Sequence, residues 1–185
     1  MFRTAAQFDN MYAMAYLLES GCDVNCADEK QLTAFHSAII RGHLDVVKFL
    51  VTVDDIDVNA LDVNSASPLH YAVWNDDVDI IQFLVSCHGV DLNIAGANGR
   101  TPLHEAVKSG FLDVLQILSG GYGININCED VKGMTPFHLS AKRGHDTIIQ
   151  FLKSYPGIDL ECKTESEETA ADLAKTKEIR EMINN

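Results

Sequence analysis

Apolar residues recur along the chain in short blocks that have the spacing of a helix. The first, second, fourth and fifth positions of each block are apolar, in residues 46–50, 80–84, 114–118 and 148–152. This spacing places the apolar side chains on one face of a helix and leaves the middle residue, Lys or Gln, on the other. An aspartate comes directly before three of the blocks, and a carboxylate stabilises a helix N-terminus. Each block therefore predicts an amphipathic helix.

A shorter helix is predicted before each of these blocks, because start and stop signals frame it. Ser followed by Pro, or Thr followed by Pro, supplies an N-cap hydroxyl and a first-turn proline, so helices are expected to begin at Pro68, Pro102 and Pro136. Residues that tolerate the left-handed conformation end these helices, at Gly42, Gly110, Gly144 and, in one copy, Asp76. The two helices of each unit should run antiparallel.

The whole pattern repeats with a period of 34 residues. Histidine occupies the same position four times, at His36, His70, His104 and His138. Between units, a short Asp-Val-Asn stretch or a close variant alternates polar and apolar residues and leads to turn-forming pairs such as Asn98-Gly99, so a small β-turn finger is expected there. A period of this length is typical of repeat architectures, in which each unit buries its apolar side against its neighbours.

The motif around each histidine, written Thr-Pro-Leu-His-Glu-Ala at residues 101–106, resembles the signature of the ankyrin repeat. This resemblance implies an all-α repeat solenoid, a stack of antiparallel helix pairs with short β-turn fingers. We assign residues 1–185 to a single ankyrin repeat domain. Its parts are a partial N-terminal helix pair at 1–22, repeats at 23–56, 57–90, 91–124 and 125–158, and a C-terminal capping repeat at 159–185. The N-terminal pair is either a true start or a cut through a longer array.

Composition narrows the class of protein without changing the predicted fold. Of 185 residues, 46% are hydrophobic and 22% are charged, as in folded globular domains. Fourteen Lys and Arg against 27 Asp and Glu give a net charge of −13, which disfavours nucleic acid and direct binding to anionic membranes. Five scattered cysteines and no apolar signal segment favour a reducing compartment, the cytoplasm, with the nucleus as the alternative. We expect a monomer.

The recurrent histidines invite a catalytic or metal-binding interpretation, but the period favours a structural role. A step of 34 residues places each His at the same position of successive units. The chain has no phosphate-binding loop, nucleophile elbow or His-Glu-x-x-His motif, and Cys22 and Cys26 have no second ligand pair at zinc-site spacing. We therefore expect no enzyme activity, no cofactor and no metal.

One modification is implied by the ankyrin resemblance, hydroxylation of the asparagines that recur at the finger position. These residues are Asn25, Asn59, Asn93 and Asn127. The favoured alternative is a turn asparagine whose amide bonds the local backbone.

The resemblance also implies a concave surface, built by fingers and first helices, that binds another protein. Its positions hold two acids, Glu29 and Glu105, against seven bases: Lys30, Arg41, Arg100, Lys108, Lys132, Lys142 and Arg143. A face of +5 on this acidic chain predicts a groove for an acidic segment, with aromatic side chains contacting an apolar anchor. The predicted partner-binding residues are Ile40, Arg41, Tyr71, Trp74, Asn75, Arg100, Glu105, Lys108, Lys132, Met134, Lys142 and Arg143.

The function favoured by these inferences is a non-catalytic protein-interaction module, an adaptor or scaffold that binds its partner on the concave face. The alternatives are a structural segment of a longer ankyrin array, the ankyrin portion of a larger multidomain protein, and an enzyme whose site no motif reveals.

Overall fold

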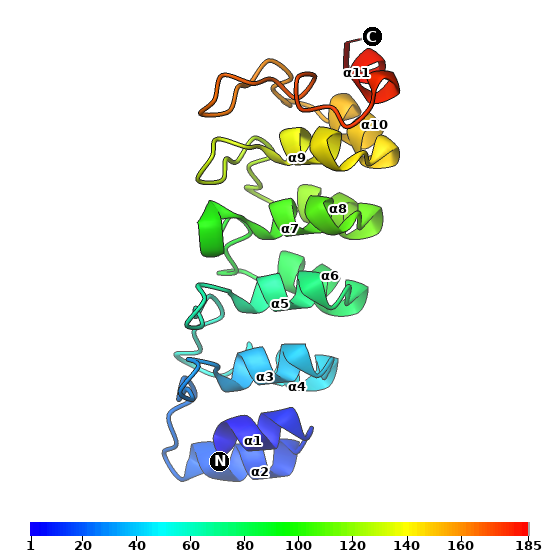
Figure 1. Cartoon of the computed structure of the whole chain (residues 1–185). Helices are drawn as coiled ribbons and strands as arrows, with labels where there is room; N and C mark the ends of the chain where they lie inside the picture. The colour runs from blue at the N-terminus through cyan, green and yellow to red at the C-terminus, as the bar shows by residue number, and fades with distance from the viewer. Residues whose placement is uncertain (185) are drawn as a thin grey trace. The chain divides into compact units, whose positions relative to one another are not determined.

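The structure, a computed structural model, describes residues 1–184 and consists of helices joined by turns (Figure 1). The chain divides into two compact units, Met1–Asp91 and Leu92–Asn185. The first unit holds three helix pairs: α1 (Phe2–Gln7) with α2 (Met11–Glu19), α3 (Ala34–Ile40) with α4 (Leu44–Leu50), and α5 (Pro68–Trp74) with α6 (Val78–Ser86). The second unit holds a 3-10 turn, η1 (Ala97–Gly99), and the helices α7 (Pro102–Ser109), α8 (Leu112–Ser119), α9 (Pro136–Arg143), α10 (Asp146–Ser154) and α11 (Lys177–Asn184).

Within each unit, helix pairs form successive layers with their turns projecting to one side (Figure 1). No β-strand occurs among residues 1–184, so the all-α prediction is confirmed. Each helix pair from α1/α2 to α9/α10 lies inside one of the predicted segments from 1–22 to 125–158. Their assignment to a single domain stays a prediction.

Helices begin and end where the capping signals predicted. The helices α5, α7 and α9 begin at their prolines, and the hydroxyls of Ser67 and Thr135 accept hydrogen bonds from backbone amides of the first turn. Gly110 and Gly144 follow their helices with φ of 81° and 79°, the left-handed conformation that glycine adopts at low cost. Asp76 takes the same place with φ of 55°. The predicted signals therefore act through local backbone geometry.

Apolar side chains fill the layers of each unit. The first unit buries Phe35, Ile39 and Leu84, and the second buries Leu103, Leu118 and Phe137. The apolar stripes of α4, α6, α8 and α10 supply fully or almost fully buried residues at the predicted positions: Val46, Val47, Leu50, Ile80, Ile81, Leu84, Val114, Leu115, Leu118, Ile148, Ile149 and Leu152. No helix among residues 1–184 is long and apolar enough to cross a membrane.

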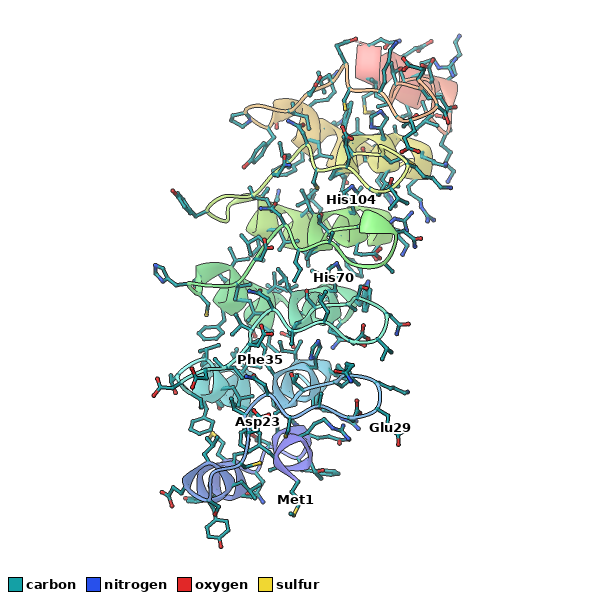
Figure 2. All side chains as sticks on the ribbon, turned by 90° about the vertical axis from the view of Figure 1, so that its left-hand side faces the viewer. Met1, Asp23, Glu29, Phe35, His70 and His104 are labelled. Carbon is teal, nitrogen blue, oxygen red and sulfur yellow. The ribbon has the colours of Figure 1, made fainter. Side chains whose placement is uncertain are left out.

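The predicted fingers are tight turns closed by backbone hydrogen bonds. In the turn at 62–66, the Asp62 amide donates to the Ala66 carbonyl over 3.0 Å and the Ser65 amide donates to the Asp62 carbonyl over 2.9 Å. Neighbouring fingers within a unit are also joined, since the Val63 amide donates to the Lys30 carbonyl. Glu29 lies at a finger tip, away from the helices (Figure 2). The fingers therefore present short rows of side chains beside the first helices.

Candidate protein-binding surfaces

The first unit carries an aromatic pair formed by a partly buried tyrosine and an exposed tryptophan. Tyr71 and Trp74 lie one turn apart on α5, and their ring centroids are 5.2 Å apart in an edge-to-face arrangement. Tyr71 also meets the ring of His36 from α3, edge to face, at 5.7 Å. Trp74 remains 44% exposed. The result is a large apolar side chain that faces solvent and rests on a packed neighbour.

A hydrogen bond to the finger holds the Tyr71 ring in place. Its hydroxyl donates to the Asp62 carboxylate over 2.8 Å. Burial and then this carboxylate raise the pKa of Tyr71 to about 12, so the phenol stays protonated and keeps donating at neutral pH. The aromatic pair is therefore oriented before any partner arrives, which lowers the conformational entropy lost on binding.

Three further predicted residues of the first unit, Ile40, Arg41 and Asn75, lie at the C-terminal ends of α3 and α5. Arg41 is exposed and makes no ion pair within the described residues, and Ile40 is partly exposed. Asn75 is exposed, but its amide donates to the carbonyls of Ile39 and Ile40 over 3.3 and 3.4 Å. Asn75 therefore satisfies carbonyls at the end of α3, which gives it a structural role in addition to the predicted one.

In the second unit, two of the predicted bases are already paired with buried carboxylates. Arg100 lies 3.5 Å from the Asp130 carboxylate and 3.8 Å from that of Glu105, and Lys108 lies 2.7 Å from Glu105. Asp130 and Glu105 are both buried. Positive charge at Arg100 and Lys108 is thus largely compensated inside the unit.

Two of the twelve predicted partner-binding residues, Glu105 and Met134, are largely buried in the folded chain. Glu105 is 6% exposed and Met134 is 5% exposed. Glu105 turns inward because it pairs with Lys108 and Arg100, whereas Met134 lies at the base of its finger, where its amide and carbonyl both bond Asp130. Their positions within the repeat had assigned both residues to the predicted concave surface.

A hollow of about 280 Å³ opens beside this paired group. Its lining combines basic and apolar side chains: Arg100, Lys132, Met134, Leu139, Lys142 and Arg143. Lys132 lies on the finger, and Lys142 and Arg143 form the last turn of α9. These three bases are exposed and form no ion pair within residues 1–184. Of the seven bases of the predicted +5 face, these three form a local cluster around the hollow.

A comparison with protein families agrees with these repeats. The family model described as "Ankyrin repeats (3 copies)" matches residues 2–96 and 88–164. The chain belongs to the ankyrin repeat family. A search of curated proteins gave no match.

The histidines of these ankyrin repeats act as helix caps. Nδ1 of His104 accepts from the Thr101 amide over 3.2 Å and lies 3.0 Å from the Thr101 hydroxyl, while its Nε2 lies 2.9 Å from the Met134 carbonyl. His36 makes the equivalent contacts with Thr33 and Ala66. Because a carbonyl only accepts, Nε2 carries the proton in both rings. His36 and His104 therefore each join a helix start to the next finger, in line with the predicted structural role.

Stability of the ankyrin stack should fall as the pH drops below about 6.5, the ordinary value for histidine. Burial lowers the pKa of His36, His104 and His138 in the folded chain, so between the lowered and ordinary values the unfolded chain binds more protons. The midpoint of urea unfolding, measured at pH 7.5 and at pH 5.5, tests this expectation. Both values lie above the range in which carboxylates titrate. An unchanged or higher midpoint at pH 5.5 contradicts the expectation.

The recurrent asparagines bind backbone, but not the local backbone that the sequence predicted. The side-chain amide of Asn59 donates to the Gly89 carbonyl over 2.7 Å, and its oxygen accepts from the Asp91 amide over 2.9 Å. Asn25, Asn93 and Asn127 each bond the backbone 30 and 32 residues ahead in the same way. Each asparagine thus ties one ankyrin repeat to the next.

Aspartates at the finger bases are structural positions that the sequence prediction missed. One carboxylate oxygen of Asp62 accepts from the amides of Asn64 and Ala66, both at 2.8 Å. Burial alone would raise the pKa of Asp62, but these amides and the Tyr71 hydroxyl lower it overall. Asp28 and Asp130 organise their fingers in the same way. Asp28 and Asp62 lie 34 residues apart, and Asp130 lies two periods beyond Asp62 with Gly96 at the position between them, so the shared repeat position was the available signal.

No group of three or more His, Cys, Asp or Glu side chains that could hold a metal occurs in the described part of the chain. All five cysteines are free thiols. Cys128 is buried, and this burial raises the pKa of its thiol to about 11. That thiol is therefore protonated and unreactive at neutral pH, as expected of a packing residue.

Proposed function

We propose that this ankyrin repeat chain is a non-catalytic adaptor that binds an acidic segment of a partner protein, with an apolar anchor on the aromatic pair. Ankyrin repeats are generally protein-interaction modules. The observation that carries the finer proposal is the uncompensated cluster of Lys132, Lys142 and Arg143 on a chain whose net charge is −13. The aromatic pair of the first unit supplies the second contact.

Each surface has a separate physical role in this proposal. Exposed bases attract acidic segments over distances near the Debye length, which speeds association and makes it depend on salt. Trp and Tyr contribute more binding energy than most residue types, because they bury large areas while losing little side-chain entropy. We further propose that the chain acts in the cytoplasm as a monomer.

Reversing two exposed charges should slow association with the partner. The double variant Lys142→Glu, Arg143→Glu is compared with Lys48→Glu, an exposed base on α4 that matches one charge change. Proteins captured both by wild type and by Lys48→Glu are the candidate partners. We expect their association rate to fall about tenfold at low salt, and the difference to shrink at high salt.

Surface binding kinetics at two salt concentrations measures this effect. The Lys48→Glu variant changes the net charge by half as much as the double variant, and it tests whether charge reversal away from the hollow has a general effect. Equal association rates for the double variant and wild type would contradict the basic cluster as a contact surface, whereas an equal loss in Lys48→Glu would show only a general charge effect.

A structural segment of a longer array is the second candidate, favoured by an exposed apolar surface on α1 and α2. Phe8 and Tyr12 are 71% and 94% exposed. A nearby hollow of about 420 Å³ is lined mainly by apolar residues, among them Ala5, Phe8 and Leu17. A further repeat packed on this surface would bury it. The full transcript distinguishes the two candidates.

A further inference from the structure

The hollow on the second unit has the composition of a site for one compact anion attached to a short apolar stem. Two buried apolar side chains, Met134 and Leu139, are part of its lining. The remaining four side chains of its lining are basic, and none is acidic. An apolar floor and a basic rim suit a ligand whose charge is at one end.

The charges around the hollow are unevenly compensated. Arg100 is held by the carboxylates of Asp130 and Glu105. Lys132, Lys142 and Arg143 form no such pair among the described residues, and Lys175 adds a charge nearby, since its ammonium donates to the Arg143 carbonyl over 3.3 Å. The rim therefore carries about three unneutralised charges, which repel one another in the free protein.

The helix dipole explains only part of this arrangement. Bases in a last helical turn are stabilised by the C-terminal dipole, which accounts for Lys142 and Arg143 on α9. Lys132 comes from a finger, where no helix dipole acts. The finger position is set by backbone bonds, because the Lys132 amide donates to Asp130 over 2.8 Å and its carbonyl accepts from the Glu165 amide over 3.0 Å. Two independent elements thus bring bases to one hollow.

We propose that this hollow binds a phosphorylated side chain, phosphoserine or phosphothreonine, in the partner's segment. The phosphate dianion matches the uncompensated charge better than a single carboxylate does, and Arg143 offers it a planar pair of donors. The methylene or methyl group of the stem then contacts Met134 and Leu139. This inference rests on the proposed function and names the group recognised within the acidic segment.

A phosphorylated peptide is favoured over a phosphorylated lipid because of the rest of the chain. The net charge of −13 repels a broad anionic membrane surface, whereas a short peptide segment can bring its charge to the basic hollow alone. The same hollow could meet an isolated headgroup, so lipid vesicles form one arm of the test.

The test uses the ¹⁵N-labelled full chain and three capped tripeptides, Ala-phosphoserine-Ala, Ala-Ser-Ala and Ala-Glu-Ala. We expect the phosphopeptide to shift the backbone amides of Lys132, Met134 and Arg143 and to bind about tenfold more tightly than the glutamate peptide. Lys142→Ala with Arg143→Ala should weaken it about tenfold, and Lys132→Ala should weaken it in the same direction. Lys48→Ala is the matched control and should leave binding unchanged.

Several outcomes would overturn the proposal. Equal binding of the phosphorylated and glutamate peptides would assign the hollow to acidic side chains in general, which leaves the proposed function intact and removes this inference. Shifts confined to other residues, or equal weakening by Lys48→Ala, would remove the site. Sedimentation with vesicles containing phosphatidylinositol 4-phosphate, abolished by the same variants, would assign the hollow to lipid. The amide spectrum of each variant reports whether it is folded.

Discussion

Replacing Leu118 by alanine is expected to lower the free energy of unfolding by about 2 to 5 kcal/mol. Leu118 lies on α8 and is fully buried. The shorter side chain loses the free energy gained by burying an aliphatic group away from water. It also leaves a cavity, because the packed layers relax only in part. Leu84→Ala on α6 of the first unit should have an effect of the same size, since Leu84 is 1% exposed.

Denaturant titration measures both effects. Gln116→Ala on the same helix is the matched control, because Gln116 is exposed and should change stability by no more than about 0.5 kcal/mol. A change of that small size for Leu118→Ala would contradict the assigned face of α8. Circular dichroism of the folded variants confirms that the helices remain.

Replacing Trp74 by alanine is expected to cost at least about 2 kcal/mol of binding to the partner. The indole offers a large exposed apolar surface, and Tyr71 holds one side of it in an edge-to-face contact. A partner's apolar anchor would displace water from that surface while losing little freedom in the protein.

Two companion variants separate the contact from the packing beneath it. Trp74→Phe keeps a smaller ring and should lose only part of the binding energy. Tyr71→Phe removes the hydrogen bond to Asp62 and should affect orientation more than contact area. Titration of the captured partner by calorimetry decides the matter, and wild-type affinity in Trp74→Ala would refute the aromatic pair as the anchor site.

Local features of the fold could be read from the sequence because they depend on neighbouring residues alone. The prolines that open α5, α7 and α9 and the left-handed residues that follow the first helices act through their own backbone angles. The apolar stripes likewise predicted which residues of α8 and α10 are buried. The 34-residue period and the motif around each histidine indicated a resemblance to the ankyrin repeat, and the family comparison confirmed it.

The candidate sites were less predictable because they depend on contacts between repeats. The direction of the Glu105 side chain is set by its ion pairs with Arg100 and Lys108. The predicted charge of the face counted all three side chains as accessible, although they compensate one another. Asp130 was not counted at all, although it compensates Arg100 across 30 residues of sequence. The hollow likewise combines residues from a finger and a helix, which no local pattern brings together.

The asparagine bridges also control when their own side chains become accessible to chemistry. Both polar atoms of the Asn59 side chain are engaged by the next repeat, at the Gly89 carbonyl and the Asp91 amide. An oxygenase that hydroxylated Asn59 would need access to this side chain, so the junction would have to open before the reaction. The extent of hydroxylation at each of the four asparagines would then depend on how often its junction opens. Comparing the four values would show where along the chain local unfolding is most frequent.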